Sequence, residues 1–199
     1  RTATKGVRHP ITYLVEAADD IVYSVVDLED GVRKRAIDWK RTEDSLRERA
    51  SKGSLLLLAL KRARAQIEHS GLAGRSQDEA MVQAFRIQAI TVMVPAVIDI
   101  FRHRYEKIMQ GKYHGELVVD EKSETKSLVE SCKAILRETL YRNDEILRLE
   151  VRGRTVIHDL MKLFWEAASS FDGCHTTRTY PGKAYLLMSE NYRRQFEDD

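Results

Sequence analysis

Proline and glycine are scarce in this sequence of 199 residues, which holds 3 Pro and 10 Gly. Both residue types weaken helix interiors, so their scarcity favours helices over loop-rich or disordered structure. Hydrophobic residues make up 43% and charged residues 32%, a balance typical of a soluble globular chain that is long enough to bury a core. We therefore expect an all-α fold, a helical bundle that forms a single helical region over residues 1–199.

Cysteine is also scarce, and long apolar runs are missing. Cys132 and Cys174 show no CxxC or metal-ligand spacing, which indicates reduced thiols rather than a disulfide. The longest apolar runs, at 55–60 and 90–100, fall short of the roughly 20 residues that span a bilayer. We expect a cytoplasmic protein with no membrane span.

Several signals of function are absent as well. The formal net charge of +2 is too small to indicate a nucleic acid or a membrane surface by itself. The sequence holds no Gly-rich phosphate loop, GxSxG elbow, zinc-finger spacing or internal repeat, which disfavours several enzyme classes. It starts at Arg1 without a signal-peptide pattern, so we expect the chain to begin inside a longer polypeptide.

Apolar residues that recur at three- and four-residue steps predict a series of helices. Pro10 is placed to begin the first and Gly31 to end it. Ser76 and Ser127, each followed three residues later by Glu, read as capping boxes, and Pro95 predicts a kink. Loops are expected over 111–119, where a brief extended piece is the alternative, and over 170–182. The predicted helices cover about 10–30, 42–50, 53–70, 76–109, 127–141, 143–169 and 183–196.

Acidic residues interrupt the apolar pattern of the first helix. Steps of four residues turn a helix by about 40°, so Asp19, Tyr23 and Asp27 share one slowly drifting face. A solvated helix face is the plain interpretation of such a pattern. Ala17 and Ala18 beside the acids, with apolar residues around most of the circumference, instead indicate a helix packed on most sides, whose acids need a partner or a metal ion.

Residues 8–30, RHPITYLVEAADDIVYSVVDLED, resemble the signature helix of the dGTPase and deoxynucleoside triphosphate triphosphohydrolase family of the HD superfamily. The resemblance implies the C-terminal, all-helical portion of an HD-domain phosphohydrolase. It also implies that Asp19 is a metal ligand and that Tyr23 packs against the deoxyribose, which discriminates against a 2′-hydroxyl. Asp27 would then accept a hydrogen bond from the sugar 3′-hydroxyl.

The implied activity is the hydrolysis of dGTP, or of dNTPs more broadly, to a deoxynucleoside and triphosphate. A hard divalent cation such as Mg²⁺ or Mn²⁺ prefers carboxylate and imidazole ligands and can polarise a phosphoryl oxygen. The family holds this ion with a histidine, a His-Asp pair and the later aspartate, but only His9 precedes Asp19 here. We therefore expect the N-terminal HD half to be absent, the catalytic residues to lie elsewhere and the chain alone to be inactive.

Other interpretations remain open at this stage. His158-Asp159 spells the His-Asp pair, but it follows Asp19, and adjacent helical residues point about 100° apart, so a surface pair is the plainer interpretation. The basic stretches 33–35 and 61–64 fit a solvated face, or contact with single-stranded nucleic acid. The alternatives to an enzyme are a helical oligomerisation or regulatory module and a helical nucleic-acid-binding protein. The family resemblance also implies a homo-oligomer.

Overall fold

The computed structural model describes residues 8–170 and 178–198, and within these ranges the chain is all-α, with eight α-helices, a short 3-10 helix and no strand. The chain divides into two compact units, Arg1–Asn143 and Asp144–Asp199. The all-α prediction is confirmed, and the single region over 1–199 stays a prediction. The elements are α1 (Pro10–Arg33), α2 (Trp39–Arg49), α3 (Leu55–Ile67), α4 (Gly74–Met109), α5 (Thr125–Glu138), η1 (Leu140–Arg142), α6 (Asp144–Ser169), α7 (Tyr180–Leu187) and α8 (Glu190–Asp198).

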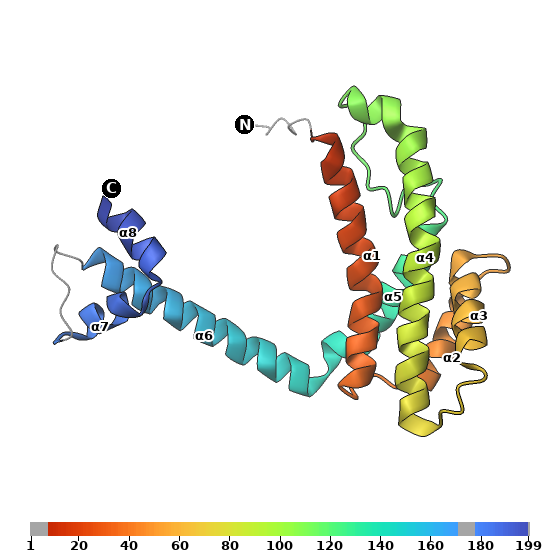
Figure 1. The fold of residues 1–199 in the computed structure, drawn as a ribbon, viewed down its shortest axis with the longest axis horizontal. Coiled ribbons are helices and arrows are strands. Elements are labelled where there is room, and N and C mark those ends of the chain that lie inside the picture. The colour runs from red at the N-terminus through yellow and green to blue at the C-terminus, as the bar shows by residue number, and fades with distance from the viewer. Residues whose placement is uncertain (1–7, 171–177, 199) are drawn as a thin grey trace. The chain divides into compact units, whose positions relative to one another are not determined.

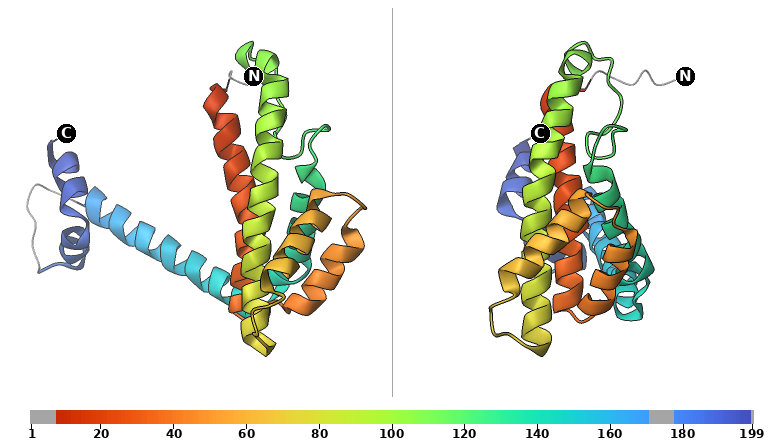
Figure 2. Two further views of the ribbon diagram at one scale, coloured as in Figure 1. Left: turned by 45° about the vertical axis from the view of Figure 1, so that its right-hand side comes forward. Right: turned by 90° about the vertical axis from the view of Figure 1, so that its right-hand side faces the viewer.

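Unit 1 is built on α4, which lies between α1 on one side and α3 on the other (Figures 1 and 2). α1 runs antiparallel to α4, and α5 packs against both. The side chains buried between these helices are large and apolar, as close packing of a helical core requires. The largest include Leu28, Leu56, Leu60, Phe85, Met93, Leu128 and Leu136.

α1 begins at Pro10 as predicted but ends later than predicted. His9 caps it, because the His9 Nδ1 atom accepts a hydrogen bond from the Ile11 N–H at 3.3 Å. Gly31 does not end the helix, and the sequence-based prediction was wrong here. A Cβ atom at Gly31 would lie 2.5 Å from the Ile37 Cδ1 atom. This glycine therefore serves the close approach of the segment that follows α1.

Side-chain caps set the starts of α2 and α3. The Asp38 carboxylate accepts from the Arg41 N–H at 2.8 Å, so α2 begins three residues before the predicted position. The Ser54 hydroxyl accepts from the Leu57 N–H at 3.3 Å and starts α3.

Two buried glutamates link neighbouring helices of unit 1. Glu29 of α1 pairs with Arg33 at 2.8 Å and with Arg86 of α4. Glu43 of α2 pairs with Arg47 at 2.6 Å and with Arg64 of α3 at 3.0 Å. Each buried carboxylate meets two guanidinium groups, which offsets the free energy cost of removing its charge from water.

α4 begins at Gly74, so the predicted capping box was wrong. Ser76 lies inside the helix, and Glu79 instead pairs with Arg75 at 2.5 Å. Pro95 is contained within the helix. By length and composition α4 could cross a membrane, a test that the core helices of soluble proteins also pass. It packs against α1 and α3, and 39% of its most apolar segment is buried.

The capping box predicted at Ser127 was also wrong, because α5 begins at Thr125 and Ser127 lies within its first turn. The loop predicted over 111–119 is confirmed. α5 also contains Cys132, whose burial raises the pKa of its thiol to about 12. Cys174 lies outside the described residues.

The loop between α4 and α5 is held by a buried polar network. The Arg104 guanidinium donates to both Asp120 carboxylate oxygens, at 3.0 and 2.8 Å, and the Tyr113 hydroxyl donates to Asp120 Oδ2 at 2.9 Å. The Tyr13 hydroxyl of α1 donates to the Tyr113 backbone carbonyl at 2.5 Å. The guanidinium of Arg104 holds the pKa of Asp120 at about 2, below its usual 3.8.

Unit 2 consists of α6, α7 and α8. Ala167 of α6 packs with Ala184 and Tyr185 of α7 in a small core. The sequence predicted one helix over 183–196, whereas the structure has two, α7 and α8, with a break at Met188 and Ser189. The predicted loop over 170–182 lies largely outside the described residues, and α7 begins inside that range.

We predict that replacing Asp120 with Asn lowers the free energy of unfolding by about 3 kcal/mol at pH 7, because it leaves Arg104 without its bidentate partner. The pKa of Asp120 is lower in the folded state, so its ion pair stabilises the fold above about pH 4, and this stabilisation is lost as the pH falls towards 2. Urea unfolding of wild type and Asp120→Asn between pH 2 and pH 7 measures both effects.

Glu121 provides the matched control, because it also pairs with Arg104, at 3.1 Å, but its side chain is 79% exposed against 5% for Asp120. Glu121→Gln should lower the free energy of unfolding by less than about 1 kcal/mol. Equal losses for the two variants would contradict this account of the network.

Candidate functional site

One face of α1 is exposed along the length of the helix and carries the three residues singled out in the sequence. Val15 is 61% exposed and Tyr23 is 58% exposed, and Asp19 lies between them on the same side. Ile11 and Val22 are also exposed on this face. The predicted shared face is therefore present, and it combines apolar side chains with carboxylates.

The opposite face of α1 is buried against the rest of unit 1, through Tyr13, Ala17, Ile21, Val25 and Leu28. The prediction that α1 is packed on most sides is therefore wrong for the described residues. A row of exposed apolar residues on one helix face is a common mark of a surface that another element covers.

Asp19 is exposed and does not meet other metal-ligating groups in the described part of the chain. Residues 8–170 and 178–198 contain no group of three or more His, Cys, Asp or Glu side chains that could hold a metal ion. His9 precedes Asp19 by ten residues, or about 15 Å along a helix, which is too far for both to bind one ion. The described residues therefore offer one carboxylate of a possible metal site and not a complete site.

Asp20, which has no predicted role in the site, has a structural partner in α5. Its Oδ1 atom accepts a hydrogen bond from the Lys133 ammonium at 2.6 Å, which ties α1 to α5. Asp20 is 113 residues from Lys133 in the sequence, so no local pattern could have revealed the pair. The two adjacent acids thus differ, since Asp20 is bound within the fold and Asp19 faces outward.

Asp27 is half-buried and is held by a residue that the sequence did not single out. The Tyr141 hydroxyl of η1 donates to the Asp27 Oδ2 atom at 2.9 Å. This bond fixes the carboxylate near the C-terminal end of the exposed face. The contact joins positions 114 residues apart, which explains why sequence patterns did not reveal it.

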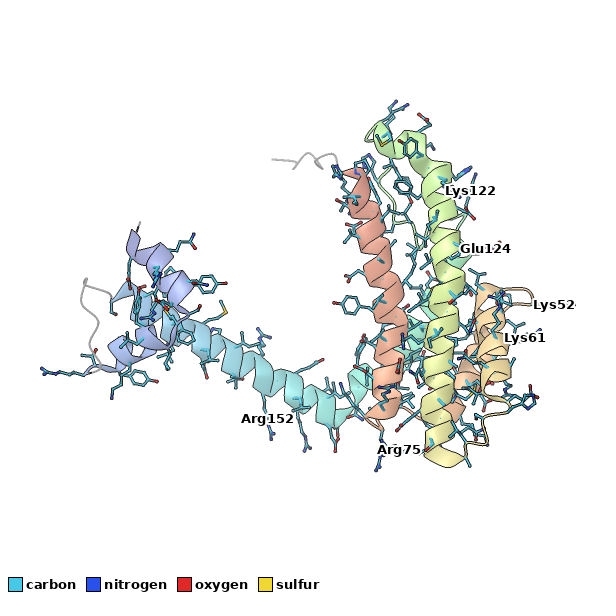
Figure 3. All side chains as sticks on the ribbon, viewed as in Figure 1. Lys52, Lys61, Arg75, Lys122, Glu124 and Arg152 are labelled. Atoms are coloured by element: carbon cyan, nitrogen blue, oxygen red, sulfur yellow. The ribbon has the colours of Figure 1, made fainter. Side chains whose placement is uncertain are left out.

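Several residues of the basic stretches 33–35 and 61–64 form ion pairs inside unit 1. Arg33 pairs with Glu29, Lys34 pairs with Asp30 at 3.7 Å, and Arg64 pairs with Glu43. Lys61 is exposed and projects outward from α3 (Figure 3). These contacts favour structural and solvated roles over a continuous surface for nucleic acid.

His158 and Asp159 are both exposed on α6 of unit 2, and the His158 Nδ1 atom lies 3.8 Å from the Asp159 Oδ1 atom. This geometry is that of a surface pair. Neither residue belongs to a cluster of potential metal ligands among the described residues.

The chain is similar over nearly all of its length to several curated proteins that share one name. Over 187 residues, 94% of the chain, it is 29% identical to a deoxyguanosinetriphosphate triphosphohydrolase-like protein of Pseudomonas aeruginosa. Over 96% of the chain it is 27% identical to proteins of the same name from Listeria monocytogenes and Listeria innocua. These similarities relate the chain to dGTP triphosphohydrolase-like proteins. No family model matches the chain.

The chain spans about 40% of the length of the dGTP triphosphohydrolase-like proteins it matches. This coverage is consistent with a C-terminal part of such a protein, as the sequence predicted. The likeness extends over nearly all of the chain, well beyond the signature helix at residues 8–30.

We predict that Asp19 and Asp20 differ in their contribution to folding. Asp20→Ala and Lys133→Ala should each lower the free energy of unfolding by about 0.5–1 kcal/mol, the range for a partly exposed ion pair. A double-mutant cycle of the two should show a coupling of about 0.5 kcal/mol.

Asp19→Ala, the matched control one residue away, should change the free energy of unfolding by less than about 0.5 kcal/mol. Thermal or urea unfolding followed by circular dichroism measures all four variants. A large loss for Asp19→Ala would show that this carboxylate has a partner within the fold.

Proposed function

We propose that the exposed face of α1 is one wall of the active site of a metal-dependent dNTP triphosphohydrolase. The observation that carries the proposal is the presence of Asp19, Tyr23 and Asp27 on one exposed face in a chain related to dGTP triphosphohydrolase-like proteins. The apolar residues between them fit a surface that becomes buried in the complete protein.

Each of the three residues has a distinct proposed role. Asp19 contributes one carboxylate ligand to a divalent cation such as Mg²⁺ or Mn²⁺, whose other ligands come from outside this chain. Tyr23 presents a flat ring to the deoxyribose, which leaves no room for a 2′-hydroxyl. Asp27 accepts a hydrogen bond from the 3′-hydroxyl, and Tyr141 holds its other oxygen in place.

The chain alone should be inactive, because a single carboxylate cannot bind a catalytic ion in the way that a set of three or four ligands does. The remaining ligands and the catalytic residues are proposed to lie in the part of the full-length protein that corresponds to the uncovered 60% or so of its relatives. We propose a cytoplasmic location for the complete enzyme, with dGTP or another dNTP as its substrate.

A non-catalytic role as a helical regulatory or oligomerisation module is the second candidate. The observation that favours it is the incomplete ligand set among the described residues. The two candidates differ in what the full-length protein does to a dNTP, which an activity assay decides.

We predict that the full-length protein releases triphosphate from dGTP or another dNTP with Mn²⁺ or Mg²⁺, and that the 199-residue chain alone does not. Asp19→Asn should lower kcat/KM at least a thousandfold, because the loss of a metal ligand removes about 4 kcal/mol of transition-state stabilisation. Asp27→Ala should lower it about 10- to 100-fold, the effect of one charge-assisted hydrogen bond. Tyr23→Ala should lower the ratio of kcat/KM for dGTP to kcat/KM for GTP.

Asp30→Asn is the matched control, since Asp30 is an exposed acid of the same helix that pairs only with Lys34 among the described residues. It should leave kcat/KM unchanged. A folded full-length protein that releases no triphosphate from any of the four dNTPs would contradict the enzyme proposal and favour the regulatory module.

A further inference from the structure

The turn that joins α1 to α2 lies beside a pocket of about 360 Å³, which also borders the last turn of α5. Two arginines line this pocket, Arg35 in the turn and Arg41 in the first turn of α2. Neither side chain forms an ion pair or a hydrogen bond with another described residue. Two guanidinium groups therefore line one pocket without a partner.

The two acidic residues that line the same pocket already have partners. The Asp38 carboxylate accepts a hydrogen bond from the Arg41 backbone N–H at 2.8 Å, as the cap of α2. The Glu138 carboxylate accepts from the Arg49 guanidinium at 3.1 Å. Because neither acid binds the Arg35 or Arg41 side chain, both guanidinium groups are free to bind an anion.

A buried hydroxyl group indicates a ligand independently of the charges. Thr42 lines the pocket and is only 4% exposed, yet its hydroxyl has no hydrogen-bond partner among the described residues. A polar group that is removed from water costs free energy unless it is hydrogen-bonded. An acceptor atom bound in the pocket would satisfy this hydroxyl.

Arg35 has a backbone conformation that usually requires glycine. Its φ is 61°, and the N–H groups of Arg35 and Ala36 donate to the Val32 and Gly31 carbonyls at 3.0 and 2.9 Å. These bonds form the Schellman motif at the end of a helix, where glycine is usual because a Cβ atom is strained in the left-handed conformation. An arginine here keeps the strain and places a guanidinium group at the pocket, which favours a role for its side chain.

We propose that this pocket binds a small phosphate-bearing anion through Arg35, Arg41 and Thr42. The planar donors of arginine match phosphate oxygens, and a phosphate group with close to two negative charges at pH 7 balances two guanidinium groups, whereas one carboxylate balances only one. The pocket volume of about 360 Å³ is within the range of small-molecule sites, about 300–1,000 Å³. This site is independent of the proposed catalytic role of α1.

The surroundings of the pocket favour a free phosphate compound over a nucleic-acid strand. The neighbouring basic residues Arg33 and Lys34 form ion pairs with Glu29 and Asp30. The described residues therefore offer a pocket and not a continuous basic track along which a strand could lie.

The test is calorimetric titration of the chain with inorganic phosphate and with tripolyphosphate, without divalent metal ions so that the proposed metal site does not contribute. We expect both anions to bind, and Arg41→Ala should weaken binding by about tenfold or more. Thr42→Val, which removes only the hydroxyl, should weaken binding as well. Arg62→Ala is the matched control, because Arg62 is an exposed arginine of α3 that does not line the pocket. Wild-type protein that binds neither anion would overturn the proposal, as would an equal loss in Arg62→Ala.

Arg35→Gly separates binding from folding. Glycine adopts the left-handed conformation without strain, so this variant should raise the melting temperature by about 2–4 °C. The same variant should weaken phosphate binding about tenfold, because it removes one of the two guanidinium groups. A variant that is more stable but binds phosphate as tightly as wild type would overturn the role of Arg35.

Two further titrations test the class of ligand. Acetate at the same ionic strength should not displace phosphate, and displacement by acetate would overturn the preference for phosphate. A single-stranded oligonucleotide should bind no more tightly than tripolyphosphate. Tighter binding of the oligonucleotide that is lost in Arg41→Ala would overturn the assignment to a free phosphate compound and favour a nucleic-acid backbone.

Discussion

The burial of one face of α1 against α4 and α5 is the constraint on which the arrangement of unit 1 depends. Apolar packing alone would let the helix rotate by small amounts, but polar contacts at both ends fix it. Tyr13 binds the loop that follows α4, and Glu29 binds Arg86 within α4. With its rotation fixed, α1 must turn Asp19 and Tyr23 to the opposite, exposed side. The fold therefore presents these side chains on a rigid element, as a binding site requires.

The acidic residues of α1 differ in whether a side chain from another helix binds them. Asp20, Asp27 and Glu29 are each engaged by a side chain from another helix, at Lys133, Tyr141 and Arg86 respectively. Asp19 is exposed and belongs to no cluster of potential ligands in the described residues. In a relative of dGTP triphosphohydrolase-like proteins, an acid left facing outward on a partly apolar face supports a role that involves atoms outside this chain.

Periodicity predicted the helices well, because apolar spacing reports directly which face a helix buries. Local motifs were less dependable. Ser76 and Ser127 match the capping box but lie inside α4 and α5, and Gly31 meets Ile37 instead of ending α1. The shared face of Asp19 and Tyr23 could be predicted from helix geometry, whereas the pairing of Asp20 and the exposure of that face depend on contacts between distant segments.

The central claim is that the exposed face of α1 becomes part of a metal site when the full-length protein is complete. The most direct measurement is a crystal structure of the full-length protein soaked with Mn²⁺, with the ion located by its anomalous scattering. We predict an anomalous peak about 2.1 Å from an Asp19 carboxylate oxygen, the distance of a hard cation to its oxygen ligands, with Tyr23 and Asp27 on the same side of the cavity. A fully loaded protein whose metal lies elsewhere, with Asp19 still facing solvent, would contradict the account.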